Sequence, residues 1–151
     1  MSITRKIQSW GDLHHPKILD IIRMLLGIFL VVKGYIFLNN TGYLRYLIIT
    51  NEAINQPPQV IAFIIFYVTY MHLLGGLLIF LGLYTRLWAI LQLPIVFGAV
   101  FLVNILSPFV NSELWLSILV LALLCLFVVV GSGPLSIDGL LLKTKSVTEE
   151  R

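Results

Sequence analysis

Four long apolar stretches, separated by short polar turns, dominate the pattern of hydrophobic and polar positions along the chain. They cover residues 18–38, 60–83, 87–106 and 114–130. Each is close to the roughly 20 residues that a transmembrane helix needs to cross a bilayer. Apolar side chains occupy all sides of these stretches, as expected when lipid and neighbouring helices surround a span. The pattern predicts an all-α integral membrane protein, a four-helix transmembrane bundle that forms a single domain over residues 1–151.

The connection between the first two stretches, residues 39–59, is the longest one. Its middle part, Tyr43 to Thr50, is apolar but too short to cross a bilayer, which favours a short interfacial or re-entrant helix. Pro57 and Pro58 then end this excursion and start the second span. We expect this segment to be the lid of any site at the outer face. The segment at 1–15 and the tail at 143–151 are polar.

Composition and charge support a membrane location and set the orientation. Hydrophobic residues make up 59% of the chain and charged residues only 11%. Basic residues mark the cytoplasmic side of membrane proteins, and here they gather on one side: Arg5, Lys6, Lys17, Arg86, Lys143, Lys145 and Arg151. The other side has only Arg45. Both termini are therefore expected in the cytoplasm, and the net charge of +3 calls for no nucleic-acid partner.

Polar residues inside the spans form two layers when their depth is counted at about 1.5 Å per residue. The outer layer is a candidate ligand site, because a lysine at membrane depth needs a buried partner or an aqueous cavity. Its members are Lys33, Tyr67, Asn104 and Glu113.

The inner layer favours a structural role. It contains Asp20, Arg23, Arg86 and Asp138. Because Arg86 and Asp138 lie at turns, we expect them to pair and to clamp two loops together. Arg23 shares one face of the first span with Gly27 and Gly34, and that face should be buried against other helices.

Three motifs in this order resemble the DoxX family. They are Arg23-x-x-x-Gly27 with Lys33-Gly34, the run GGLLIFLGLYTR at 75–86, and GSGPLSID at 131–138. The resemblance extends from about Asp20 to Leu140. It implies a small four-helix protein of the bacterial inner membrane. Some members of the family are subunits of quinone-linked oxidoreductases, or of thiol and superoxide defence complexes.

His72 lies near the middle of the second span, where family members often carry a glutamate three residues before the glycine pair. One interpretation makes it a donor to a quinone carbonyl or a proton acceptor, with Tyr67 or Tyr70 beside it and with Gly75 and Gly76 leaving room for a flat head group. The alternative is a hydrogen bond that joins two helices as packing. The only cysteine is Cys125, and no set of metal ligands or pair of haem ligands is present at a common depth, so no metal site is expected.

The resemblance and the two layers lead to one main expectation and two alternatives. We expect an accessory membrane subunit of a quinone-linked redox complex, without catalytic activity of its own, that contacts non-covalently bound quinone. Its partners would be the lipid bilayer and other membrane subunits or further copies of the chain. The first alternative is a protein that binds or transports a lipid or small molecule at Lys33, Asn104 and Glu113. The second is a structural scaffold in a larger membrane assembly.

Overall fold

The computed structural model describes residues 17–49, 56–104, 111–133 and 135–139, which are helical apart from short turns and connections. No β-strand occurs in these ranges, so the predicted all-α class is confirmed for them. The polar segments at 1–15 and 143–151 lie outside the described residues. The elements are α2 (Lys17–Asn39), α3 (Thr41–Ile49), α4 (Pro58–Tyr70), the π-helical turn η2 (Met71–Gly75), α5 (Gly76–Leu81), α6 (Thr85–Gly98), the π-helical segment η3 (Ala99–Asn104) and α7 (Asn111–Val130).

Two of these helices are long and apolar enough to cross a membrane, within the ranges just given. They cover Ile18–Asn39, with 22 residues, and Pro58–Leu81, with 24 residues, where α4, η2 and α5 follow one another without a break. At about 1.5 Å per residue, each exceeds the hydrocarbon thickness of about 30 Å. Two shorter apolar helices cover Thr85–Phe101 and Leu114–Val130. A bundle that crosses the membrane four times therefore stays a prediction.

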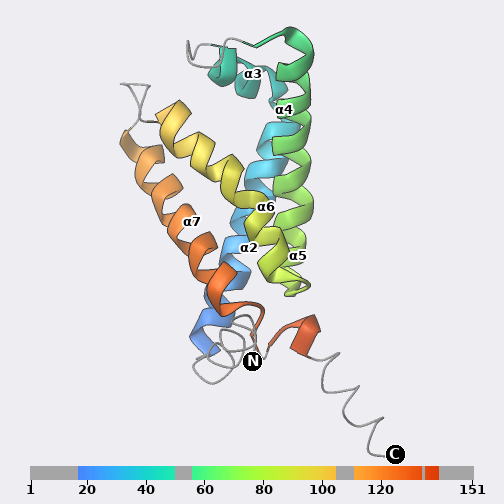
Figure 1. Cartoon of the computed structure of the whole chain (residues 1–151), viewed down its shortest axis with the longest axis vertical. Helices are drawn as coiled ribbons and strands as arrows, with labels where there is room; N and C mark the ends of the chain where they lie inside the picture. Colours follow the sequence, from blue (N-terminus) through green and yellow to red (C-terminus); the bar gives the residue numbers. More distant parts are fainter. Residues whose placement is uncertain (1–16, 50–55, 105–110, 134, 140–151) are drawn as a thin grey trace, which may run out of the picture.

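The long helices run up and down the molecule (Figure 1). Helix α2 rises from the lower end, α3 lies across the upper end, and α4 with η2 and α5 descends beside α2. Helix α6 then rises and α7 descends against it. Consecutive long helices are thus antiparallel, as short connections in a helical bundle require.

Glycines let α2 and the second long helix approach closely. A Cβ atom added at Gly27 would lie only 2.7 Å from the Cβ of Phe80, and one at Gly34 would lie 2.8 Å from the backbone nitrogen of Leu73. Gly76 faces α2 from the other side, because a Cβ there would lie 2.9 Å from the carbonyl oxygen of Gly27. Arg23, Gly27 and Gly34 are all buried, as the sequence predicted for this face.

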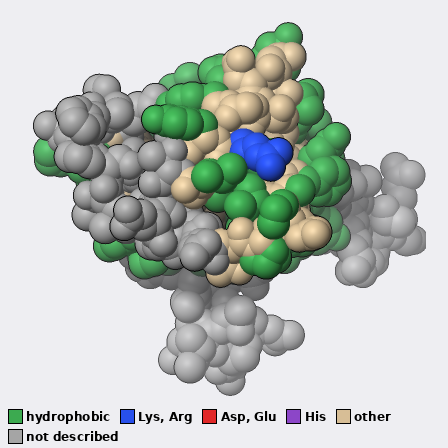
Figure 2. All heavy atoms as spheres, turned by 90° about the horizontal axis from the view of Figure 1, so that it is seen from above, with side chains coloured by type: hydrophobic (Ala, Val, Ile, Leu, Met, Phe, Trp, Pro, Cys, Tyr) green, Lys and Arg blue, Asp and Glu red, His purple; other side chains and the backbone are tan. Residues whose placement is uncertain are grey.

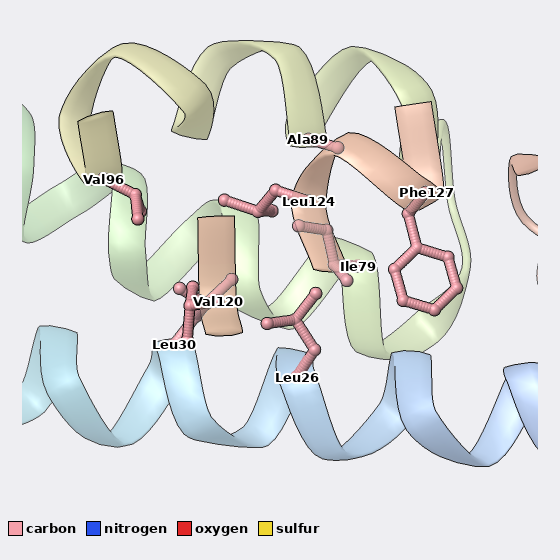
Figure 3. Packing of buried hydrophobic residues seen from close by; sticks show 8 residues of the cluster. All are labelled: Leu26, Leu30, Ile79, Ala89, Val96, Val120, Leu124 and Phe127. Atoms are coloured by element: carbon pink, nitrogen blue, oxygen red, sulfur yellow. The ribbon is translucent and has the colours of Figure 1, made fainter. Parts of the chain in front are cut away.

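The main hydrophobic core lies where all four long helices meet (Figure 3). Figure 3 shows side chains from α2, α5, α6 and α7 converging on one another. The cluster consists of Leu26, Leu30, Ile79, Ala89, Val96, Val120, Leu124 and Phe127. Helix α7 contributes Val120, Leu124 and Phe127, which are four and three residues apart and therefore lie on one face of the helix. This face packs against the other helices, and Phe127 on it is completely buried.

Helix α3 packs on the upper part of α4 through a second, smaller core. Leu44 and Ile48 from α3 are buried with Ile61 from α4. Arg45 and Tyr46 on the opposite side of α3 are exposed. In the view onto this end (Figure 2), the coloured surface is hydrophobic side chains, other uncharged side chains and backbone, with one basic patch and no acidic side chain in sight. A short helix thus lies between the first two apolar stretches, where the sequence predicted an interfacial or re-entrant one.

The second long helix ends at Leu81 rather than at the predicted residue 83. Gly82 adopts a left-handed conformation, with φ of 71°, and its N–H donates to the carbonyl of Ile79. The N–H of Leu83 donates to the carbonyl of Leu78. These are the bonds of a Schellman-type helix end, which glycine favours because it has no Cβ. The glycine in the GLYTR motif therefore stops the helix and starts the turn to α6.

Candidate functional site

A cavity of about 640 Å³ lies between the helices, on the side toward α3. Residues of α2, α3, α4, α6 and α7 line it, together with His72 of η2 and Ala99 of η3. Its lining is mainly aliphatic and aromatic. The polar side chains among its described lining residues are Lys33, Tyr43, Tyr67, His72 and Ser117. An apolar cavity with a few convergent polar groups is the usual form of a small-molecule site.

Three predicted site residues meet at this cavity although they come from two different helices. Lys33 of α2 and Tyr67 of α4 line it together with His72 of η2. Lys33 and Tyr67, which the sequence places at similar depth, become neighbours because α2 and the second long helix are antiparallel, and His72 follows Tyr67 on that same helix. Asn104 ends η3 and Glu113 lies in the first turn of α7, but their side chains are outside the described part of the chain.

His72 is buried, with 7% of its surface exposed, and a hydrogen bond fixes its ring. Its Nδ1 lies 2.9 Å from the carbonyl oxygen of Val68, one turn earlier. The ring of Phe37 meets it edge-on, with 5.6 Å between the ring centroids. On the α2 side, Gly34 leaves the space that this ring needs, since a Cβ there would lie 3.0 Å from the Cβ of His72.

The π-helical turn that carries His72 is held from the neighbouring helix by Gln92. A π turn inserts one extra residue into a helix and disturbs the regular bonding of its carbonyls. Gln92 of α6 is completely buried, and its Nε2 donates a hydrogen bond of 2.7 Å to the carbonyl of Met71. Gly75 makes this possible, because a Cβ there would lie 2.8 Å from the same nitrogen.

The glycine pair does not provide room for a ligand, contrary to the interpretation from sequence. The amide of Gln92 fills the space beside Gly75, and the backbone of α2 fills the space beside Gly76. Small residues here serve close helix packing, which is their commonest use in membrane helices. The cavity that His72 lines is bordered instead by Phe37 and Lys33.

Lys33 and Tyr67 bring polar atoms into the otherwise apolar cavity. Lys33 is half-buried, and its Nζ lies 5.9 Å from the centroid of the Phe29 ring, within the range of a cation–π contact. The hydroxyl of Tyr67 donates to the carbonyl of Leu91 at a long distance of 3.5 Å. An ammonium group offers only donors, so Lys33 suits a ligand oxygen that accepts.

Helix α3 closes one side of the cavity, since Tyr43, Leu44 and Ile48 all belong to its lining. The connection that the sequence marked as a lid therefore contributes directly to the site. Residues 50–55 of the same connection lie outside the described residues.

The inner polar layer is a separate cluster that ties three segments together. Arg23 is completely buried, and its guanidinium donates to the carbonyls of Ile79, at 3.2 Å, and Leu135, at 2.8 Å. It also lies 3.6 Å from Asp20, which is equally buried and accepts a hydrogen bond from the backbone N–H of Leu135. Arg23 thus joins α2 to α5 and to the segment after α7.

The predicted pair of Arg86 with Asp138 is replaced by two separate contacts to backbone. Arg86 donates to the carbonyls of Val129 and Val130 at the end of α7. Asp138 accepts a hydrogen bond of 2.8 Å from the backbone N–H of Tyr84. Free carbonyls at a helix end and the N–H groups at a helix start both need partners, so each charged side chain satisfies a helix terminus instead of the other side chain.

Sequence reasoning missed the role of Gln92, and it did not single out Phe37 or Ser117. Gln92 lies inside the third apolar stretch, at 87–106, and counts to the depth of the inner polar layer. A glutamine in such a stretch signals that a backbone group elsewhere lacks its partner. Which group that is depends on the π turn, and the sequence carries no clear signal for a π turn.

The long apolar helices and the polar groups at their interfaces define a helical membrane protein with an internal cavity. Within that class, the chain belongs to the DoxX family, whose family model matches residues 18–105. The match covers α2 to η3, and therefore Lys33, Tyr67, His72 and Gln92. It does not include α7 or the GSGPLSID motif, which the sequence analysis had counted in the resemblance. Neither the curated proteins nor the solved structures contain a significant match to the chain.

Proposed function

We propose that the chain crosses a bacterial inner membrane four times, with both termini in the cytoplasm. The two shorter apolar helices, Thr85–Phe101 and Leu114–Val130, have about the minimum length for a span. Large hydrophobic side chains are exposed on every long helix, for example Leu25, Phe63, Ile90 and Leu119. Lipid is the environment in which such a surface carries no cost.

The cavity is proposed to bind a hydrophobic molecule with a flat polar head group, such as a quinone. The observation that carries this proposal is the meeting of Lys33, Tyr67 and His72 in one apolar cavity of about 640 Å³. Aromatic side chains in the lining offer surfaces for a ring, and the three polar side chains offer hydrogen-bonding groups for its oxygens. A histidine used only for packing would be enclosed by side chains instead of facing such a space.

In this proposal the protein is an accessory subunit of a quinone-linked redox complex, with other membrane subunits or further copies of itself as partners. No covalently bound cofactor is needed, since the ligand is held by non-covalent contacts. No group of three or more metal-binding side chains occurs among the described residues. The redox chemistry would then belong to the partner.

The test is purification in a mild detergent, followed by mass spectrometry of co-purifying proteins and extracted quinones. Ala99→Phe places a larger side chain in the cavity, whose lining includes Ala99. Ala62→Phe is the matched control, because Ala62 is exposed on α4 and absent from that lining. We expect stoichiometric quinone in the wild type and the control, and loss of quinone in Ala99→Phe. Equal quinone content in all three preparations would contradict binding in this cavity.

A second candidate function is the binding or transport of a lipid or other small molecule. It is favoured by the position of α3, because Tyr43, Leu44 and Ile48 line the cavity and could separate it from the outer face. Bulk phospholipid in the purified protein, without quinone and without a redox partner, would favour this function. A scaffold role predicts instead a stoichiometric partner that is retained equally well by Ala99→Phe.

A further inference from the structure

The hydrogen bond of His72 decides which of its two ring nitrogens carries a proton. The Val68 carbonyl oxygen, 2.9 Å from Nδ1, can only accept, so Nδ1 must be the donor. A neutral imidazole has one N–H group, and its other nitrogen carries a lone pair. With Nδ1 committed to Val68, Nε2 of the neutral ring is an acceptor.

The surroundings of His72 favour this neutral form. The nearest charged side chain in the cavity lining is the ammonium group of Lys33, and no carboxylate occurs among the described lining residues. A second positive charge close to an ammonium group in an apolar site is costly. The described residues give Nε2 no hydrogen bond, although His72 lines the cavity. The site therefore presents one acceptor that a ligand can satisfy.

We propose that His72 makes the cavity selective for an aromatic ring that carries a hydroxyl group, a phenol or a hydroquinone. The hydroxyl would donate to Nε2, whereas a carbonyl or ether oxygen at the same place would face a lone pair with its own lone pairs. This inference rests on the proposed function, because it names the ligand class for the same cavity. Of the two roles that the sequence left open for His72, donor to a quinone carbonyl or proton acceptor, it favours the acceptor.

The other groups in the cavity fit such a ring. The edge of Phe37 meets His72, and Phe29 and Tyr67 add aromatic surface to the lining. Lys33 can donate to a second oxygen of the ring, which a hydroquinone has and a simple phenol lacks. The reduced form of a quinone pair therefore binds more tightly than the oxidised form.

A pair of probes that differ only in the donor tests the proposal without any redox chemistry. They are a para-alkylphenol and its methyl ether, with the same alkyl chain, titrated into the full-length protein in detergent. One hydrogen bond is worth roughly a 3- to 10-fold difference in affinity, and we expect the phenol to bind more tightly by that factor. His72→Phe should bring the ratio close to one. Tyr70→Phe removes a hydroxyl from an exposed neighbour that does not line the cavity, so it should keep the preference.

The outcomes separate this inference from the proposed function. Equal binding of both probes by the wild type, with quinone still bound, overturns the selectivity of His72 and leaves the ligand site intact. Failure of the phenol, the ether and quinone to bind overturns both. Tighter binding of the ether than of the phenol would mean that Nε2 carries the proton. That result would overturn the inference about His72 but not the proposed ligand site.

A measurement on the wild type covers the case in which His72→Phe does not fold. The chain has three histidines, so nitrogen-15 labelling of histidine gives a simple spectrum in which the tautomers and the doubly protonated ring are distinct. We expect one buried histidine with the proton on Nδ1, and a shift of its Nε2 resonance on addition of the phenol but not of the ether. A proton on Nε2 in the ligand-free protein would overturn the inference.

Discussion

Replacement of Arg23 by methionine should be among the most destabilising changes in the chain. The substitution keeps much of the side-chain length but removes the hydrogen bonds to the carbonyls of Ile79 and Leu135. It also leaves Asp20 buried without the positive charge that lies 3.6 Å away. Removing one member of a buried ion pair typically costs about 3–5 kcal/mol, and we expect Arg23→Met to lower the free energy of unfolding by about that amount.

The partner substitution should cost less. In Asp20→Asn the side-chain oxygen can still accept from the N–H of Leu135, and Arg23 keeps both of its carbonyl acceptors. The double variant Asp20→Asn/Arg23→Met no longer buries an isolated carboxylate. Its cost should therefore be smaller than the sum of the single costs, with a coupling energy of at least about 1 kcal/mol.

Unfolding in mixed micelles, with a denaturing detergent as the variable and circular dichroism as the signal, gives these free energies. Arg45→Met is the matched control, because Arg45 is exposed on α3, and it should change stability by less than about 0.5 kcal/mol. If Arg23→Met lay within about 1 kcal/mol of the wild type, or if the two single costs simply added, the proposed lock of α2, α5 and the segment after α7 would be refuted.

Three further substitutions test the packing around the cavity and core. In Gly34→Leu the new Cβ would lie only 2.8 Å from the backbone nitrogen of Leu73. We expect this variant to lose about 1–3 kcal/mol of unfolding free energy in the same assay. Gln92→Leu leaves the Met71 carbonyl without its side-chain donor, for which we expect a loss of about 1–3 kcal/mol. Phe127→Ala empties a completely buried position, and a loss of about 3 kcal/mol or more, measured with the detergent titration, is expected. Unchanged stability in any of the three would contradict the contact described for it.

Much of the fold could be predicted because apolar length has a direct physical meaning in a membrane. A run of apolar residues long enough to cross the bilayer must satisfy its backbone internally, and a helix is the simplest way to do so. Depth counted along the helices also placed Lys33 near Tyr67, which line one cavity, but it put His72 nearer the middle of the membrane, between the two layers. The burial of Gly27 and Gly34 followed from their position on one helix face.

The predictions for Arg86, Asp138 and Gly75 were wrong for a different reason. Several groups compete for the same hydrogen bond or the same space, and the sequence does not show which of them is closest in the fold. Arg86 and Asp138 were paired because opposite charges at turns attract, but helix termini offered both of them backbone partners. Gly75 was assigned to a ligand, whereas the amide of Gln92 takes that space. In each case the side chain forms a hydrogen bond to a backbone group instead. Whether that backbone group is free to bond depends on where a helix ends or contains a π turn.

Under the proposed function, the two polar layers separate stability from ligand binding within one bundle. At the inner end, Arg23 bonds to carbonyls in two separate segments, and Asp138 secures the start of α6. At the α3 end, the polar groups of Lys33 and His72 border a cavity instead of filling it. Substitutions in the inner layer should therefore change the free energy of unfolding, and substitutions that line the cavity should change ligand affinity. Gln92 connects the two properties, because it stabilises the π turn from outside the cavity while holding His72 within it.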